Sequence, residues 1–358
     1  MKRRLRGFLA LRGADREEIA RAEREGWLPL LTLDRMLMPG RPTHDLDAVA
    51  HLAGADPATA RRIWRALGFP DTPPDLPAFS DAHVEALATL TSARYGAAAF
   101  GDEPEESLLA QIRILSAGLA RLAEMEADRI ARALQDGRAA GMDDEGLALA
   151  AVDSFDWPTV AELVDFAHRI QLRAALWRQL AGGEPAGAGA PIRCIGFVDL
   201  SGYTALSRRL DPEALTALVA RFEELAYDSV AEHGGRVVKT IGDEVMFVTG
   251  EPAAGVTITL DLVRRAAEDD VLPEAKAGLA AGPVLVREGD CFGPVVNVAS
   301  RLAEGARAGT ILVADSVRAA LADDESLTWR RVRLRRPRDV GPEAVWSLTV
   351  TGEPVPRD

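Results

Sequence analysis

The sequence of 358 residues has few cysteines, few aromatic residues, a deficit of positive charge and no long hydrophobic run. Two cysteines, Cys194 and Cys291, cannot staple a small disulfide scaffold, so we expect free thiols in a cytoplasmic protein. No apolar run approaches the roughly 20 residues of a membrane-spanning helix, and the apolar stretch in the start MKRRLRGFLALRG is too short for a signal peptide. The net charge of −13 argues against a general nucleic-acid binder, which needs a positive surface.

Hydrophobic residues make up 47% of the chain, which is enough for two cores, and the length favours two domains. Residues 1–180 carry helical patterns and predict an all-α domain. Residues 181–190, AGGEPAGAGA, contain no core-forming side chain and predict a flexible linker. Residues 191–358 alternate strand and helix patterns, so we expect an α+β domain there.

In the first half, periodicity and capping residues predict helices over 16–25, 44–54, 57–67, 81–95, 105–134 and 157–180. Asp56 followed by Pro57 is a typical helix start, with an N-cap and proline at the first helical position. The apolar segment from Leu28 to Met38 is either a docking segment or a short buried helix.

Two features of this half have two interpretations each. The stretch AVAHLAGADPATARRIWRALGFP has the shape of a DNA-binding helix-turn-helix, but also of an ordinary αα-hairpin whose Trp64, Leu67 and Phe69 fill a core. The long helix is either dimer-forming or a plain core helix. Its apolar residues at helical spacing are Leu108, Ile112, Leu115, Leu119, Leu122, Met125 and Ile130.

The second half is organised around the stretch from Ile195 to Arg301. An apolar run ends in Asp199 and a glycine-containing turn, and a predicted hairpin, 236–241 with 245–248, has Asp243 at its tip. Two carboxylates at the ends of adjacent strands suit Mg²⁺ or Mn²⁺, ions that bridge carboxylates to substrate phosphates. The pattern therefore indicates a metal–nucleotide site.

Further elements of this half follow from the same periodicities. We expect helices over 212–233, 256–267, 295–304 and 316–321, and strands over 275–281, 284–287 and 310–314, with a final hairpin of 329–334 and 344–350. The order strand-helix-strand-strand-helix-strand is that of a ferredoxin-like core with additions.

Three ordered motifs carry a family resemblance: IGFVDLSGYT, VVKTIGDEVMF and GDCFGPVVNVASR. The segment from about Ile192 to Val350 resembles the catalytic domain of class III nucleotide cyclases. The resemblance implies conversion of ATP or GTP into the 3′,5′-cyclic monophosphate and pyrophosphate. It also implies a homodimer with two shared sites, because in this family the metal carboxylates and the purine-reading residues come from opposite chains.

The resemblance assigns roles to particular residues. Asp199 and Asp243, with the backbone carbonyl of Leu200, would hold two divalent cations, Mg²⁺ or Mn²⁺. Lys239 would donate to adenine N1 and Asp290 would accept from the N6 amino group. Guanine presents the reverse pattern, and guanylate-forming relatives usually carry Glu and Cys, so ATP is the expected substrate.

The remaining roles concern the ribose and the phosphates. Asn297 would orient the ribose, and Arg301, four residues later on one helix face, would meet the charge that builds on the α-phosphate. Phosphate oxygens would be bound at the turn after the first strand and by an arginine of the cluster 333–338, through Ser201, Gly202, Tyr203, Thr204 and Arg335.

The first half resembles the helical regulatory domain found ahead of soluble actinobacterial cyclases, some of which respond to pH or bind lipid. Acid sensitivity is a hypothesis for this chain because four of its five histidines lie there, namely His44, His51, His83 and His168. A small-molecule or lipid ligand among these helices is another. Alternatives for the whole chain are a non-catalytic nucleotide-sensing or dimerisation module, against which the intact motifs argue, and a transcription factor, against which the acidic charge argues.

Overall fold

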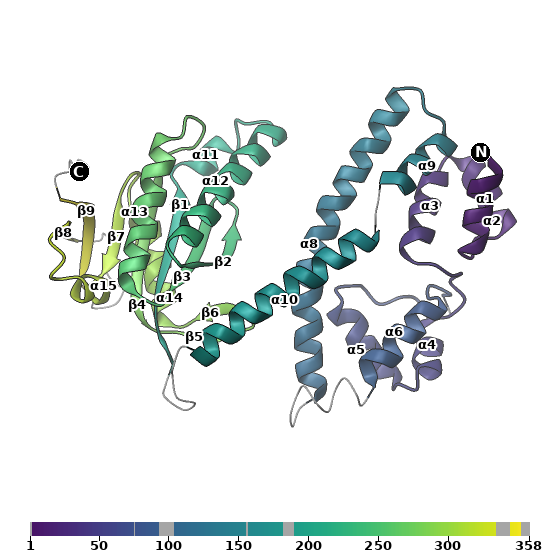
Figure 1. Cartoon of the computed structure of the whole chain (residues 1–358), viewed down its shortest axis with the longest axis horizontal. Coiled ribbons are helices and arrows are strands. Elements are labelled where there is room, and N and C mark those ends of the chain that lie inside the picture. The colour runs from purple at the N-terminus through teal and green to yellow at the C-terminus, as the bar shows by residue number, and fades with distance from the viewer. Residues whose placement is uncertain are drawn as a thin grey trace. The chain divides into compact units, whose positions relative to one another are not determined.

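The computed structural model describes residues 2–74, 76–92, 104–154, 157–181, 190–333 and 344–351. The chain divides into two compact units, residues 1–174 and 175–358, and the boundary falls inside one helix, α10 (Trp157–Ala181; Figure 1). None of the described helices is long and apolar enough to cross a membrane. Most of the predicted linker, residues 182–189, lies outside the described residues.

The first unit is helical throughout its described part. Besides α10 it contains α1 (Lys2–Leu11), α2 (Arg16–Glu25), α3 (Leu28–Leu37), α4 (Leu46–Leu52), α5 (Pro57–Ala66), α6 (Asp81–Thr91), α8 (Pro104–Ala139) and α9 (Asp144–Ser154). The expected cap of α5 is present, because the Asp56 carboxylate accepts the backbone N–H groups of Ala58 at 2.9 Å and Thr59 at 3.1 Å. Helices α1 and α9 were not predicted. They are fixed by packing, since Leu9 and Ala148 are both fully buried in one shared core.

The stretch that resembles a helix-turn-helix packs into a second core, which it shares with Phe79 and the beginning of α8. Trp64 and Leu67 pack against it, as the αα-hairpin interpretation expects. The expectation for Phe69 is wrong: its ring stacks on Trp64 with centroids 4.6 Å apart, but it is 52% exposed and does not fill the core. Segment α3 is a short helix that buries one face, with Leu31 at 2% exposure and Leu30 at 64%. Within this unit, tertiary packing therefore accounts for both segments.

Helix α8 has a buried beginning and an exposed middle. Leu108, Leu109 and Ile112 belong to the same core as Trp64, whereas Leu115 and Met125 are 54% and 62% exposed. The first turns of α8 thus agree with the interpretation as a core helix. The middle of α8 exposes apolar side chains.

The second unit is built on a seven-stranded sheet in the order β2-β3-β1-β4-β7-β9-β8. Its elements are β1 (Ile192–Leu200), α11 (Tyr203–Leu206), α12 (Pro212–Glu232), β2 (Arg236–Ile241), β3 (Glu244–Thr249), α13 (Pro252–Glu268), β4 (Ala275–Pro283), β5 (Leu285–Arg287), β6 (Asp290–Phe292), α14 (Pro294–Gly305), β7 (Ile311–Ala314), α15 (Asp315–Ala320), β8 (Leu327–Val332) and β9 (Val345–Val350). Strand β1 pairs antiparallel with both β3 and β4. The first four strands, with α12 and α13, therefore form the predicted ferredoxin-like core, and β7, β9 and β8 extend it.

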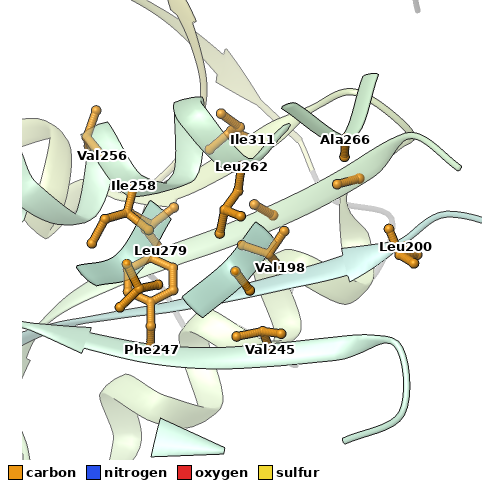
Figure 2. Packing of buried hydrophobic residues seen from close by; sticks show 14 of the residues in the cluster. Val198, Leu200, Val245, Phe247, Val256, Ile258, Leu262, Ala266, Leu279 and Ile311 are labelled. Atoms are coloured by element: carbon orange, nitrogen blue, oxygen red, sulfur yellow. The ribbon is translucent and has the colours of Figure 1, made fainter. Parts of the chain in front are cut away.

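Helices cover both faces of this sheet. On one face α12 and α13 pack on the strands, and Figure 2 shows Ile258 and Leu262 of α13 gathered with Val198, Phe247 and Leu279 of the sheet. On the other face α14 packs through two small residues and a leucine, since Ala299, Leu302 and Ala303 are buried. Strands β1, β3, β4 and β7 contribute side chains to the cores on both faces, which explains their near-continuous apolar runs.

Gly278 of β4 sets the distance between the sheet and α14. A Cβ atom at this position would lie 2.2 Å from the backbone nitrogen of Ala303 and 2.3 Å from the carbonyl oxygen of Ala299. Contacts this short do not occur between real atoms, so only glycine permits the backbones of β4 and α14 to touch.

A small separate hairpin, β5–β6, precedes α14. The sequence predicted a strand over 284–287 but not its partner β6. The connecting turn consists of Glu288 and Gly289, with φ of 55° and 81° respectively, and two left-handed residues are what a tight two-residue hairpin turn requires. Glu-Gly is a weaker turn signal than Asn-Gly, and β6 is only three residues long.

Candidate active site

The two predicted metal carboxylates meet beside the end of β1. Asp199 is the penultimate residue of β1, and Asp243 lies in the turn between β2 and β3. The backbone N–H of Leu200 donates to the carbonyl of Asp243 at 3.2 Å, and the two carboxyl groups are hydrogen-bonded to each other. Burial, this hydrogen bond and the charge of Asp199 raise the pKa of Asp243 to about 7.

Two further charged side chains beside this pair were not predicted. Lys276 of β4 places its Nζ 3.0 Å from Oδ2 of Asp199. Glu244, the first residue of β3, is half-buried, and burial together with the charge of Asp199 raises its pKa, against the opposing effect of Lys276. Both residues are direct cross-strand partners of Asp199. Their position next to Asp199 depends on how the strands pair, and the local sequence pattern does not predict strand pairing.

The carboxylate pair fits a divalent cation. Mg²⁺ and Mn²⁺ prefer carboxylate oxygens. The Asp199 and Asp243 carboxyl groups are close enough for the charge of one to raise the pKa of the other, and a bound cation would relieve this repulsion. Asp199 and Asp243 would hold the cation. The buried Leu200 follows Asp199 directly, so its backbone carbonyl is on the same strand end.

The predicted phosphate-binding turn follows β1 at once. Gly202 has φ of 78° and caps the single turn of α11, so the chain reverses sharply here. The backbone N–H of Ser201 donates to the carbonyl of Glu274 at 2.9 Å, whereas its buried hydroxyl has no hydrogen-bond partner among the described residues. Thr204 is exposed. Arg335 lies outside the described residues.

The predicted purine-reading residues form an ion pair within one chain. Nζ of Lys239 lies 2.6 Å from Oδ2 of Asp290, with the two side chains 39% and 30% exposed. The other oxygen of Asp290 accepts the backbone N–H of Cys291 at 2.8 Å. Arg236 of β2 donates to the carbonyl of Gly289 at 3.1 Å, which ties the turn of the β5–β6 hairpin to the strand that carries Lys239. This role of Arg236 was not predicted from the sequence.

Helix α14 carries the two predicted catalytic residues on its exposed side. Asn297 and Arg301 are both exposed, and Arg301 forms an ion pair with Glu304 at 3.1 Å. Across the part of the chain that the structure describes, no hydrogen bond or ion pair joins the pair Asp199–Asp243 to the pair Lys239–Asp290.

The first unit has a pocket of about 380 Å³ whose lining is almost entirely charged. Beside two prolines it is lined by Asp15, Glu17, Glu18, Arg21, Arg35 and Arg41. Such a lining suits a polar ligand better than an aliphatic chain.

Residues 191–336 match the family described as adenylate and guanylate cyclase catalytic domain. An uncharacterized protein of Mycobacterium tuberculosis is 37% identical over 86% of this chain and 80% of its own length. An adenylate cyclase of Glutamicibacter nicotianae is 34% identical over 78% of this chain and 72% of its own. A pH-sensitive adenylate cyclase of Mycobacterium tuberculosis is 31% identical over 87% and 79%.

The chain therefore belongs to the adenylate and guanylate cyclase family. The family that the three motifs predicted is confirmed, and so is the α+β class of the catalytic fold behind an all-helical region. The similarity to these relatives is longer than the catalytic domain and extends into the helical unit.

Proposed function

We propose that this protein is an adenylate cyclase that converts ATP into 3′,5′-cyclic AMP and pyrophosphate. The observation that carries the proposal is the ion pair between Lys239 and Asp290, which sets a hydrogen-bond donor beside an acceptor in a partly exposed position. Adenine offers the complementary pattern, an acceptor at N1 and a donor at N6, and guanine offers the reverse. Two of the relatives above carry the name adenylate cyclase, which agrees with this preference.

The residues divide the reaction between them. Asp199 and Asp243 would hold two divalent cations, and such ions would supply positive charge for the triphosphate and lower the pKa of the attacking ribose hydroxyl. Asn297 orients the ribose so that its 3′-oxygen faces the α-phosphate. Arg301 stabilises the negative charge that develops on the α-phosphate as the new ester bond forms and the bond to pyrophosphate breaks.

We propose further that the enzyme works as a homodimer. The family resemblance supports this arrangement, since it implies that the carboxylates of one subunit and the purine-reading pair of its partner together make a complete site. The helical unit, residues 1–180 in our division of the chain, regulates activity. Sensitivity to pH is a reasonable form of this regulation because four histidines lie in that unit and one relative is named for it.

The experiment is to measure cyclic AMP formed from ATP and Mn²⁺ by the full-length protein. Asp243→Ala should abolish the product, and GTP should be converted at a much lower kcat/KM than ATP. A fragment starting at Pro191, measured beside it across pH 5–8, gives the sign of regulation. Absence of any cyclic nucleotide from ATP and GTP in both proteins would refute the proposal, and identical pH profiles would refute regulation by pH.

A further inference from the structure

Lysine is rare in this chain. Of 42 basic residues only three are lysines, Lys2, Lys239 and Lys276, and the other 39 are arginines. Lys239 and Lys276 both lie in the second unit, and each forms an ion pair with a residue of the candidate site. Lys239 already has a role there. Lys276 does not, although it touches a proposed metal ligand.

Strand register puts Lys276 in a row with two carboxylates. Asp199 is paired with Glu244 of β3 on one side and with Lys276 of β4 on the other. Directly paired residues project from the same face of a sheet, so the order across the sheet is carboxylate, carboxylate, ammonium. Asp199 lies two and four residues after Phe197 and Ile195, which pack against α14, so it shares their face and the row lies on the α14 side.

The ion pair of Lys276 is close and largely shielded. Its Nζ lies 3.0 Å from Oδ2 of Asp199, and the two side chains are only 18% and 22% exposed. By contrast, most of the arginine ion pairs among the described residues have at least one side chain that is more than 40% exposed. The ammonium group of lysine is a point charge on a flexible four-carbon stem, so it can move away from a carboxylate oxygen easily. The planar guanidinium of arginine binds a carboxylate through two hydrogen bonds in a fixed geometry and is released less readily.

We propose that Lys276 is a positioning residue that holds Asp199 in the metal-free enzyme and competes with the divalent cation for this carboxylate. The ammonium supplies the positive charge that the cluster of Asp199, Asp243 and Glu244 needs while no metal is bound. When a cation binds, the Lys276 side chain must give up Oδ2 of Asp199. This competition weakens cation binding and couples it to release of the lysine. The inference rests on the metal site of the proposed function.

The test measures binding of Mn²⁺ alone to the full-length protein, without nucleotide, from the electron paramagnetic resonance signal of free Mn²⁺. Even with the full screening of bulk water, repulsion between one positive charge and a divalent ion about 6 Å away corresponds to about a tenfold change in affinity. Lys276→Met and Lys276→Gln should therefore bind Mn²⁺ about tenfold more tightly. Lys276→Arg, which keeps the charge, should stay close to the wild type.

Thermal unfolding of the same variants supplies a second readout. Without Mn²⁺, the two neutral variants should melt below the wild type because three carboxylates are then left without their counter-charge, and Mn²⁺ should restore most of the difference. Unchanged or weaker Mn²⁺ binding by both neutral variants would overturn the proposal. Asp243→Ala separates the two levels of inference. If it leaves Mn²⁺ binding intact, the metal site itself is wrong, whereas loss of binding in Asp243→Ala with no effect of Lys276→Gln refutes the role of Lys276 alone.

Discussion

Replacing Gly278 by alanine tests the packing that seats α14 on the sheet. The added Cβ would lie 2.2 Å and 2.3 Å from backbone atoms of Ala303 and Ala299, and backbone atoms cannot rotate away as a side chain can. Helix α14 must therefore shift outward by about 1 Å. Overpacking of this kind costs about 1–3 kcal/mol, and we expect the upper end because the clash is with backbone on both sides of one helical turn.

The stability effect should be easy to measure. For a unit of this size, 1 kcal/mol shifts the Tm by about 2–4 °C, so about 3 kcal/mol predicts a loss of about 6–12 °C in a calorimetric scan of the full-length protein. Gly250→Ala is the matched control. It lies in the same unit, at the end of β3, and an added Cβ there would meet no atom within 4 Å.

The same substitution should affect catalysis, since α14 carries Asn297 and Arg301. A displacement of about 1 Å at reacting groups can reduce the rate by about 10²-fold. We expect Gly278→Ala to lower kcat/KM for ATP well below that of Gly250→Ala at a temperature where both are folded. Equal Tm values and equal rates for the two alanine variants would refute the claim that α14 and β4 are in backbone contact.

Three more predictions concern the charged residues of the site. Lys239→Glu combined with Asp290→Cys should shift the ratio of kcat/KM values from ATP toward GTP by about 10²-fold or more, and an unchanged ratio would contradict the purine-reading role. Arg301→Ala should lower kcat by about 10²–10³-fold, whereas removal of its exposed partner in Glu304→Gln should change kcat little. In metal-free protein the raised pKa of Asp243 means that the folded state binds the extra proton, so stability should fall as pH rises from about 4 to about 7. After allowance for solvent screening this effect is about 1 kcal/mol, and urea titrations of Asp243→Asn should lack it.

The sequence predicted those parts of the structure that depend on short-range patterns. The capped start of α5 at Asp56, the strand β1 and the hairpin with Asp243 at its tip all follow from residues that are neighbours in sequence. Helix α1 and strand β6 did not follow. Helix α1 is stabilised by burial of Leu5 and Leu9 against other helices, and β6 exists because a two-residue turn with two left-handed residues closes on β5.

The site divides in the same way. Lys239 and Asp290 are 51 residues apart, and motif resemblance paired them before the structure did. The positions of Lys276 and Glu244 beside Asp199 could not be predicted, because they depend on the register between strands, which no local periodicity encodes. The contact of Arg236 could not be predicted either, because its partner is a backbone carbonyl in a turn and every residue has a backbone carbonyl.

The scarcity of side-chain amines has a practical consequence for chemical labelling. Besides the α-amino group, reagents that acylate amines have three lysine targets in the chain, and two of them, Lys239 and Lys276, are held in ion pairs at the candidate site and are 39% and 18% exposed. Acetylation read by mass spectrometry would therefore report on the site with almost no background from the rest of the surface. Nucleotide should protect Lys239, and a divalent cation that frees Lys276 from Asp199 should make this lysine more reactive.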